Sequence, residues 1–421
     1  MGQCRSMSGR SGRALSQFDL SLAALGWMSG KRQGMTRRKT ILVLHLAGRL
    51  PLAGVAWQTL HHLIGLKRLG YDVYYVEDSG APPYDPRLRS VADDCSYNVD
   101  FLKRLMERCG LQERWAYWDM GHNTYHGLSR GAVQRVFREA DAILNLCGAT
   151  RLREEHLSCP IRIYIQTDPV YEQMKEAQGD KRTAESMDAH THHFTYGENY
   201  GYPDCRVPLD RFKWTATRPP VLLDLWEYRF NPEAKNFTTI TVWKNTGKDI
   251  VFDGDTYYWS KHLNFIQFQH IPRRTSQKFE LALDADNGTT TQPLQQNGWS
   301  LVDAYEKSCD LETYRDYIYV SRGEFTVSKD LVVRTRSGWF SDRSVCYLAA
   351  GKPVITQDTG FSRFISTGRG LFSFASMDDV LVALEKINSD YAGHCEAARE
   401  IATEYFSAEK VLGRLLQAVG I

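Results

Sequence analysis

The chain has 421 residues, of which 43% are hydrophobic and 12% aromatic, and its formal net charge at pH 7 is +2. This composition predicts an ordered globular protein of two domains or three small ones, and argues against a strongly basic nucleic-acid-binding surface. Nine cysteines are scattered without CxxC pairs or metal-finger spacing, which favours reduced thiols, a cytoplasmic location and no bound metal.

Residues 1–38 are predicted to form a poorly ordered N-terminal extension. They contain the short apolar run "FDLSLAALGWM" after three arginines, but no convincing small-residue cleavage site. Met35 opens "MTRRKTILVLHLAG", which is typical of a natural protein start, so a misassigned start codon is the alternative. Because a membrane helix needs about 18 apolar residues in a row, we expect no integral membrane segment.

Residues 39–207 alternate strands and helices. The run "ILVLHLAG" predicts a buried strand, "VAWQTLHHLIGLKRLG" a helix with one apolar face, and "YDVYYVED" a second strand. The later runs "GAVQRVFREADAILNLCG" and "PIRIYIQTDP" repeat this alternation. The sequence therefore predicts an α/β domain with a doubly wound parallel sheet and right-handed crossovers.

Pro208, Pro219 and Pro220 interrupt the alternation, and residues 208–235 are predicted to form a stiff linker. Residues 236–421 then resume it. The strands expected there include "FTTITVW", "LNFIQFQHI", "KFELAL", "YRDYIYVS", "LVVRT" and "KPVITQ". We therefore expect two Rossmann-like domains that face each other across a cleft, with the last helix as a candidate to pack back on the first domain.

The run "SGWFSDRSVCYLAAGKPVITQDTG", from Ser337 to Gly360, combines a turn, a helix and a strand. Ser341 or Asp342 is expected to cap the helix, Gly351 to end it, and "VIT" to form a buried strand. In open α/β sheets ligands bind at the carboxyl ends of strands, and helix N-termini hold anions. The run is therefore predicted to form a ligand-binding edge.

This run and the two-domain alternation resemble glycosyltransferases of the GT-B fold. The family's apolar strand, turn, helix ending in Ala-x-Gly and Pro-Val-Ile strand have counterparts in "LVVRT", "RSGWFSD", "RSVCYLAAG" and "KPVI". The resemblance covers about residues 40–415 at the level of the fold. Two glutamates of many retaining members align with Gly338 and Cys346, which cannot play that part, so the stereochemical course stays open.

The resemblance implies a metal-independent hexosyltransferase without a cofactor. It would move a sugar from a nucleoside diphosphate donor, bound by the second domain, to a hydroxyl of a small-molecule or glycan acceptor, bound by the first. Two alternatives remain at this point. A nucleotide-sugar epimerase of the same fold would turn over the donor alone, and a non-catalytic protein would bind a nucleotide or sugar without transfer.

The donor site is predicted around the helix start and the "QDTG" loop. Cations beside a helix N-terminus hold a diphosphate, so Arg343, expected at the surface in the first helical turn, is a candidate phosphate ligand. Asp342 and the loop suit ribose and sugar hydroxyls. The predicted donor-binding residues are Lys329, Arg334, Arg336, Gly338, Asp342, Arg343, Ser344, Gln357, Asp358, Thr359 and Gly360.

Transfer with inversion needs a general base near the acceptor oxygen. The candidates are Asp168 after a predicted strand, His45 near the end of the first strand, and His193 in "DAHTHHFTYGEN". A turn-forming aspartate and core or metal-binding histidines are the structural alternatives, although no fourth zinc ligand follows at a recognisable spacing. Gly48 and Gly54 flank a loop that is predicted to approach a ligand in the cleft, unless it is a plain βα turn.

Overall fold

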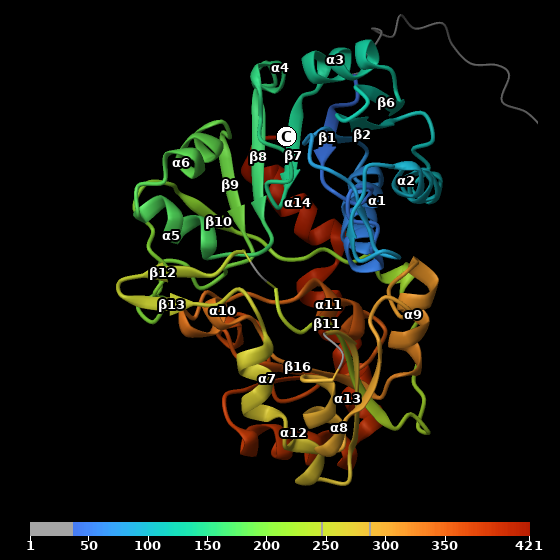
Figure 1. The fold of residues 1–421 in the computed structure, drawn as a ribbon, viewed down its shortest axis with the longest axis vertical. Helices are drawn as coiled ribbons and strands as arrows, with labels where there is room; N and C mark the ends of the chain where they lie inside the picture. The colour runs from blue at the N-terminus through green and yellow to red at the C-terminus, as the bar shows by residue number, and fades with distance from the viewer. Residues whose placement is uncertain (1–36, 246, 286–287) are drawn as a thin grey trace, which may run out of the picture. The chain divides into compact units, whose positions relative to one another are not determined.

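The computed structural model describes residues 37–245, 247–285 and 288–421. Except for Arg37 and Arg38, the expected N-terminal extension lies outside the described residues. Residues 38–421 form one unit, built from two lobes that each contain a largely parallel β-sheet (Figure 1). No helix among the described residues is both long enough and apolar enough to cross a membrane.

The first lobe contains an eight-stranded sheet with the order β10-β9-β8-β7-β1-β2-β5-β6. Neighbouring strands are parallel, except for the antiparallel edge pair β5 and β6. The central strands are buried along their whole length, as apolar runs such as "TILVL" predict. The strands are β1 (Thr40–Leu44), β2 (Asp72–Glu77), β5 (Trp115–Asp119), β6 (Thr124–Gly127), β7 (Ala142–Leu146), β8 (Ile161–Gln166), β9 (His192–Thr195) and β10 (Trp214–Ala216).

Helices cover both faces of this sheet. Ile41 and Val43 of β1 belong to the core that includes α1, whereas Leu42 and Leu44 belong to a second core with Phe137 of α3. This alternation of side chains is what a doubly wound sheet requires. The remaining elements of the lobe are α1 (Ala53–Arg68), the hairpin β3 (Tyr84–Asp85) and β4 (Ser90–Val91), α2 (Ser96–Arg108), α3 (Arg130–Glu139), α4 (Glu154–Leu157), α5 (Tyr171–Ala177) and α6 (Lys181–Asp188).

The second lobe contains a six-stranded, fully parallel sheet with the order β15-β14-β11-β16-β17-β18. A small antiparallel hairpin, β12 and β13, stands apart from it. The strands are β11 (Asn236–Val242), β12 (Ile250–Phe252), β13 (Asp255–Tyr257), β14 (Lys278–Asp284), β15 (Ser300–Asp303), β16 (Gly323–Thr326), β17 (Val354–Gln357) and β18 (Leu371–Phe374).

Three segments predicted as strands of this lobe are helices. "LNFIQFQHI" contributes α7, "YRDYIYVS" contributes α9 and "LVVRT" contributes α10. Their buried side chains recur at helical spacing, for example Tyr314, Tyr317 and Ile318 in α9, which the dense aromatic and β-branched composition conceals. The helices are α7 (His262–Phe268), α8 (Thr291–Gln296), α9 (Leu311–Val320), α10 (Asp330–Arg334), α11 (Asp342–Ala349), α12 (Met377–Ser389), α13 (Tyr391–Ile401) and α14 (Ala408–Ala418).

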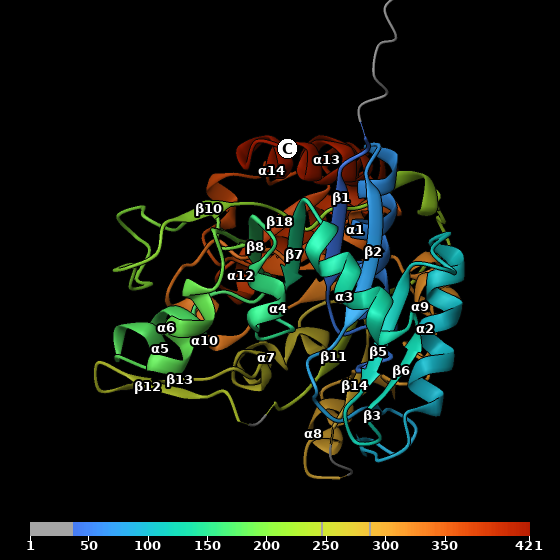
Figure 2. The same cartoon turned by 90° about the horizontal axis from the view of Figure 1, so that it is seen from above.

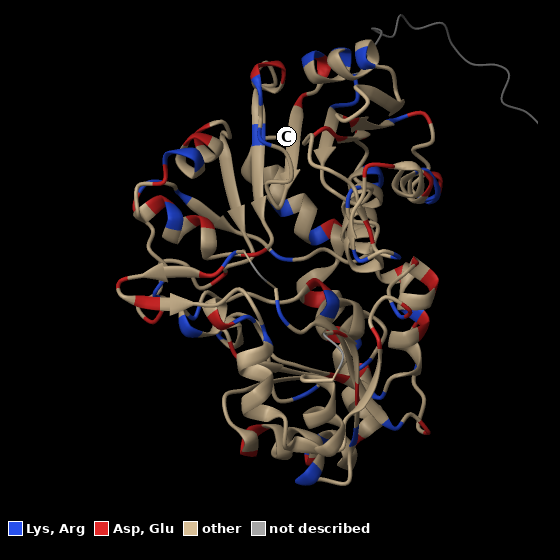
Figure 3. Cartoon of the chain, viewed as in Figure 1, with Lys and Arg blue, Asp and Glu red and all other residues tan. Residues whose placement is uncertain are grey.

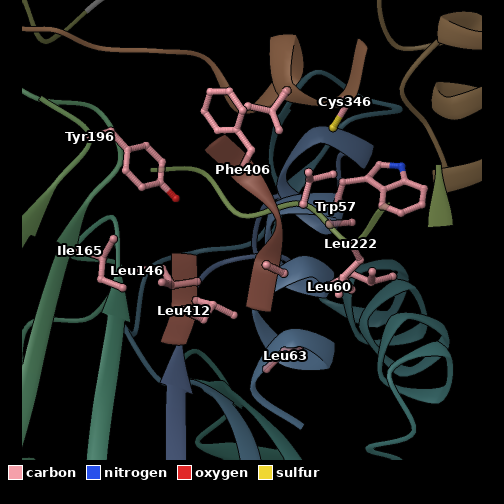
Figure 4. Close-up of a cluster of buried hydrophobic side chains, with 14 of the residues drawn as sticks. Trp57, Leu60, Leu63, Leu146, Ile165, Tyr196, Leu222, Cys346, Phe406 and Leu412 are labelled. Atoms are coloured by element: carbon pink, nitrogen blue, oxygen red, sulfur yellow. The ribbon is translucent and has the colours of Figure 1, made fainter. Parts of the chain in front are cut away.

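The segment predicted as a linker takes part in both lobes. β10 pairs with β9 in the first sheet, and Val221 forms a parallel bridge with Ser407 just before α14. Helix α14 packs against α1, where Leu412 lies so close to Gly65 that a Cβ there would come within 2.6 Å of it. Figure 2 shows α13 and α14 following one another at the C-terminal end of the chain, and Figure 4 shows Leu412 in one apolar cluster with Trp57 and Leu60 of α1.

Candidate functional site

A cavity of about 710 Å³ lies between the two sheets. The residues after β1, β7 and β8 line it from the first lobe, and the ends of β11 and β14 line it from the second. Because these strands are parallel within each sheet, the carboxyl edges of both sheets meet at this cavity. That edge is the usual ligand site of open α/β sheets. Its lining includes His45, Gly54, Asp168, Asp342 and Arg343 from the residues predicted by sequence.

The N-terminus of α11 opens into this cavity. Its N-cap residue is Ser341, which lines the cavity together with Asp342 and Arg343. The side chain of Ser341 makes no capping hydrogen bond, which leaves N–H groups of the first turn able to donate to a ligand. Such a helix start favours an anion because of its free donors and the helix dipole.

Arg343 occupies a different environment from the one expected from sequence. Instead of lying free at the surface, its guanidinium forms an ion pair with Glu324, with Nε donating to Oε1 at 2.6 Å. It also donates to the carbonyl of Ile240 and to Oγ1 of Thr326, each at 2.8 Å. The side chain therefore ties α11 to β11 and β16, while still contributing positive charge to the cavity wall.

Asp342 links the two lobes at the cavity. Its Oδ1 accepts a hydrogen bond from Nε2 of Gln58 on α1 at 3.0 Å. Burial raises the pKa of this carboxyl to about 7; the Gln58 hydrogen bond opposes that rise, and the negative charge of Asp168 adds to it. Asp342 can therefore exchange a proton near neutral pH.

Asp168, the predicted base after β8, also faces the second lobe. Its Oδ1 lies 2.6 Å from Nζ of Lys329. Burial raises the pKa of Asp168, but the Lys329 ammonium and its hydrogen bond outweigh burial and bring the pKa below its ordinary value. Lys329 in turn lies over the ring of Trp259, with Nζ 3.7 Å from the centroid. Asp168 is thus a carboxylate held in an ion pair.

Lys261 is a further basic side chain near this pair. It is buried, and burial together with the positive charges of Arg343 and Lys329 lowers its pKa well below the ordinary lysine value. Within the described part of the chain, no carboxylate forms an ion pair with it. Lys261, Lys329 and Arg343 form a basic cluster, and an added anion would favour the protonated form of Lys261.

The structure separates the predicted histidines. His45 lines the cavity, and burial lowers its pKa to about 3, so its imidazole is neutral. Its Nδ1 lies 2.7 Å from Oγ1 of Thr59, whose hydroxyl donates to the carbonyl of Val55. His193 lies outside the cavity lining, where Nε2 contacts the carbonyl of Met187 at 2.9 Å.

The side chains of the "QDTG" loop form hydrogen bonds with other segments of the protein and do not line the cavity. Oε1 of Gln357 accepts from the amide of Ser328 at 3.2 Å, and Oγ1 of Thr359 donates to the carbonyl of Trp339 at 2.6 Å. Oδ2 of Asp358 accepts a hydrogen bond from Nη1 of Arg336 at 3.3 Å. Their predicted part in donor binding stays a prediction.

Arg336 and Arg334 are likewise engaged with protein groups outside the cavity lining. Nε of Arg336 donates to Asp204 at 2.9 Å, and Nη2 of Arg334 donates to Asp255 at 2.8 Å. Both arginines are partly exposed, so these pairs compete with water. Ser344 is buried, and its hydroxyl has no hydrogen-bond partner among the described residues.

The predicted glycines have different surroundings. Gly338 has φ +85°, and a Cβ there would lie 2.3 Å from the amide nitrogen of Asn199 in the first lobe. Gly360 also has positive φ, at +97°. The Gly48 amide donates to Oε1 of Glu77 at 2.5 Å outside the cavity lining, whereas Gly54 lies in the lining with no atom within 4 Å of a Cβ position.

Several cavity residues were missed by sequence reasoning. Lys248 and Trp259 come from the segment after β11. The Lys248 ammonium lies over the Trp259 ring, with Nζ 4.5 Å from the ring centroid. Glu172 of α5 faces the same space, and burial raises its pKa. Arg89 of the first lobe forms ion pairs with Asp284 and Asp303 at the ends of β14 and β15. The signal for Lys248 was present, since "KNTGK" follows a strand's carboxyl end.

Charges of both signs are interspersed over the ribbon of both lobes, without a single basic stripe (Figure 3). This distribution agrees with the formal net charge of +2. The cations described above are therefore a local feature of the cavity region and do not belong to an extended basic surface.

No protein-family model and no curated protein matches the sequence. The fold, however, is similar to solved glycosyltransferase structures. An α-glucosyltransferase in complex with UDP and DNA has a TM-score of 0.55 at 9% identity, covering 91% of this chain and 100% of that chain. HepE of Anabaena, in complex with UDP and glucose, has a TM-score of 0.54 at 12% identity, covering 90% and 98%. AviGT4, involved in avilamycin A biosynthesis, has a TM-score of 0.53 at 10% identity, covering 90% and 96%.

The chain therefore has the GT-B fold of glycosyltransferases, with two Rossmann-like lobes that face a cleft. This confirms the fold class predicted from the alternation of strands and helices. At these identities, the similarity concerns the fold, and the chemistry has to be argued from the residues of the cavity.

Proposed function

We propose that the protein is a glycosyltransferase that moves a sugar from a nucleoside diphosphate donor to an acceptor hydroxyl. The observation that carries this proposal is the cavity where the carboxyl edges of two parallel sheets meet beside the N-terminus of α11. Its volume of about 710 Å³ lies within the range of about 300 to 1,000 Å³ that is typical of small-molecule sites. Structures of the same fold that contain UDP or UDP-glucose support a nucleotide-sugar donor.

The donor diphosphate is placed at the α11 N-terminus, next to the basic cluster of Lys261, Lys329 and Arg343. The helix N–H groups would donate to phosphate oxygens, and the anion would favour the protonated form of Lys261. Arg343 would act through its charge, because its hydrogen bonds are made to Glu324 and its neighbours. With the leaving diphosphate neutralised in this way, the reaction needs no divalent metal on the phosphates.

Asp342 is proposed as the general base in place of Asp168. A base works best when its pKa lies near the operating pH, and burial raises the pKa of Asp342 to about 7, whereas Asp168 is held below its ordinary value in the pair with Lys329. The acceptor oxygen would bond to the anomeric carbon as its proton passes to Asp342. The bond from that carbon to the donor phosphate oxygen would break, and its electron pair would leave with the diphosphate.

The acceptor is placed on the first-lobe side of the cavity. Tyr84 and Tyr164 line that side, and aromatic faces suit an apolar or sugar acceptor. His45 would act there as a neutral hydrogen-bond partner, because its pKa of about 3 keeps the imidazole uncharged. The sequence prediction of His45 as the base remains a testable alternative to Asp342.

The test is a thermal-shift panel of nucleosides, nucleoside diphosphates and nucleotide sugars, followed by assays for sugar transfer. A ligand of the native state raises the melting temperature by mass action. We expect diphosphates to stabilise the chain more than nucleosides, and a stabilising nucleotide sugar to support transfer to an added acceptor. Epimerisation of the donor without an acceptor, or binding without transfer or hydrolysis, would replace this proposal by one of the two alternatives.

A further inference from the structure

A second cluster of polar side chains lies in the first lobe and contributes nothing to the cavity lining. Cys95 precedes α2, Asp119 ends β5 and His126 lies on β6. One potential ligand atom from each lies within 4.8 Å of the other two. Sγ of Cys95 is 3.4 Å from Oδ2 of Asp119 and 3.7 Å from Nε2 of His126.

These spacings fit a tetrahedral metal centre. Zinc binds thiolate sulfur at about 2.3 Å and imidazole nitrogen or carboxylate oxygen at about 2.0 to 2.2 Å, so neighbouring ligand atoms lie about 3.3 to 3.7 Å apart. The two distances from Cys95 are close to that range. A set of one thiolate, one imidazole and one carboxylate also suits zinc better than the hard cations magnesium or calcium, which prefer oxygen ligands alone.

The charges around the cluster are compatible with a bound cation. Within the described part of the chain, Asp119 forms no ion pair with lysine or arginine, and its contacts are Cys95 and His122. A comparable cluster of Asp78, Glu155 and His156 differs, because the Arg153 guanidinium lies 2.5 Å from the Asp78 carboxylate and already supplies the positive charge.

Metal binding would remove one proton from Cys95, since a coordinating thiol is deprotonated. On binding, the S–H bond breaks, the proton passes to solvent and an S–metal bond forms, without oxidation or reduction.

We propose that Cys95, Asp119 and His126 form a binding site for a divalent transition metal, with zinc as the best fit and the fourth position open to solvent. His122 is a positioning residue, because its Nδ1 lies 2.7 Å from Oδ2 of Asp119 and can orient the carboxylate. The metal would join the start of α2 to the β5–β6 hairpin.

This site lies behind the loop that lines the acceptor side of the cavity. Asn98, in the first turn of α2, donates from Nδ2 to the carbonyls of Gly48 at 2.8 Å and Tyr84 at 2.9 Å. Tyr84 and the residue after Gly48, Arg49, line the cavity. Fastening α2 with a metal would therefore hold this part of the cavity wall without placing the metal among the reacting groups.

The experiment uses the full, tag-free chain stripped by a chelator, dialysed and titrated with zinc, and with cobalt to detect thiolate coordination by its charge-transfer absorption. We expect one zinc ion per chain for the parent. Cys95→Ser and His126→Gln should each weaken zinc binding at least tenfold, and Cys95→Ser should abolish the cobalt–thiolate band. Cys309→Ser and His192→Gln are matched controls, since both residues lie outside the cluster, and they should bind as the parent does.

His122 is tested separately. His122→Ala should weaken zinc binding by about tenfold to a hundredfold, as loss of such outer contacts does, while keeping the cobalt–thiolate band. His122→Asn, whose amide can still donate to Asp119, should restore most of the affinity. Circular dichroism and metal-free melting curves show which variants are folded. A parent that binds no zinc, or a folded Cys95→Ser variant that binds it equally well, overturns the site.

Discussion

Gln58 on α1 donates a hydrogen bond to Asp342 on α11, with 3.0 Å between Nε2 and Oδ1. The two residues belong to different lobes, and both line the cavity. A carboxyl whose pKa burial raises to about 7 is thus held by a neutral donor from the opposite lobe, not by a cation. This arrangement preserves its basicity, which an ion pair would reduce.

Asp342→Asn is the first prediction. The amide oxygen can still accept from Gln58, but the side chain can no longer take a proton, so turnover should fall by about a hundred- to ten-thousand-fold while nucleoside diphosphate binding changes little. Because only the carboxylate acts as a base, kcat/KM of the parent should rise with pH through about 7 and level off above it. Steady-state rates between about pH 5 and pH 9 give the profile.

Asp168→Asn is the control for this assignment. It removes the ion pair with Lys329 and the negative charge that adds to the raised pKa of Asp342, so it should change the rate less than Asp342→Asn does and move the pH-dependent rise to lower pH without abolishing it. A larger loss in Asp168→Asn would return the role of base to the residue predicted from sequence. Loss of nucleoside affinity in Asp342→Asn would instead indicate that Asp342 binds the ribose.

The second prediction concerns stability. An unfolded aspartate has a pKa of about 3.9, whereas burial raises that of Asp342 to about 7 in the folded chain. Between these values the native state holds a proton that the unfolded state has lost, so this residue lowers the free energy of unfolding as pH rises from about 4 to about 7. Asp342→Asn removes the effect and should be more stable than the parent by about 1 to 3 kcal/mol above pH 7.

Urea denaturation of both chains at about pH 5 and pH 8 tests this directly. The advantage of Asp342→Asn should be larger at the higher pH, because the parent's buried carboxyl is ionised there. Comparing the variant with the parent removes the contributions of other titrating groups. An advantage that shrinks with rising pH would show that the pKa of Asp342 is not raised.

The third prediction is that Arg343→Ala destabilises the fold. The substitution leaves Glu324, whose side chain is 0% exposed, without its ion-pair partner. Removing one member of a buried pair typically lowers the free energy of unfolding by about 3 to 5 kcal/mol. Arg334→Ala is the control, because its pair with Asp255 is largely exposed and should contribute less than about 1 kcal/mol. Equal urea midpoints for both variants would contradict the structural role of Arg343.

Arg343 also illustrates how far sequence reasoning reaches. The run from Ser337 to Gly360 predicted the helix and the strand, because helical spacing and an apolar strand are local signals. The partner of Arg343 is not local: Glu324 lies on β16, and only folding brings the two together. The sequence therefore predicted where α11 begins, but not which of its side chains are already bonded to other groups of the protein.

The same limit explains the metal cluster, whereas the missed helices have a different cause. Cys95, Asp119 and His126 come from an α2 start, a strand end and an edge hairpin, so no recognisable ligand spacing exists in the sequence. In α9, aromatic and β-branched residues suggested a strand, although Tyr314, Tyr317 and Ile318 are buried at helical spacing. Composition outweighed periodicity in that prediction.

The fourth prediction separates the reaction from the proposed zinc site. If the helix N–H groups and the nearby basic side chains neutralise the leaving diphosphate, adding magnesium or manganese to the zinc-loaded chain should leave turnover unchanged within about twofold. The same assay on Cys95→Ser, which replaces no residue of the cavity lining, shows how turnover depends on zinc. Turnover that appears only after magnesium or manganese is added would show that a metal accompanies the donor.

The last prediction concerns Gly338, where the turn before α11 meets the first lobe. Its φ of +85° is strained for any residue with a side chain, and a Cβ would lie 2.3 Å from the amide nitrogen of Asn199, which donates to the carbonyl of Ser337 at 3.1 Å. Gly338→Ala should therefore lower the free energy of unfolding by at least about 1 to 2 kcal/mol through backbone strain alone. It should also weaken donor binding, because it displaces the turn that positions the N-terminus of α11.

Gly131→Ala is the matched control: it lies in α3, has no atom within 4 Å of its Cβ position, and should stabilise the chain by about 0.5 to 1 kcal/mol. Urea midpoints and titrations with a nucleoside diphosphate measure both effects, and a Gly338→Ala chain that matches the parent in both would show that this contact between the lobes does not position the site.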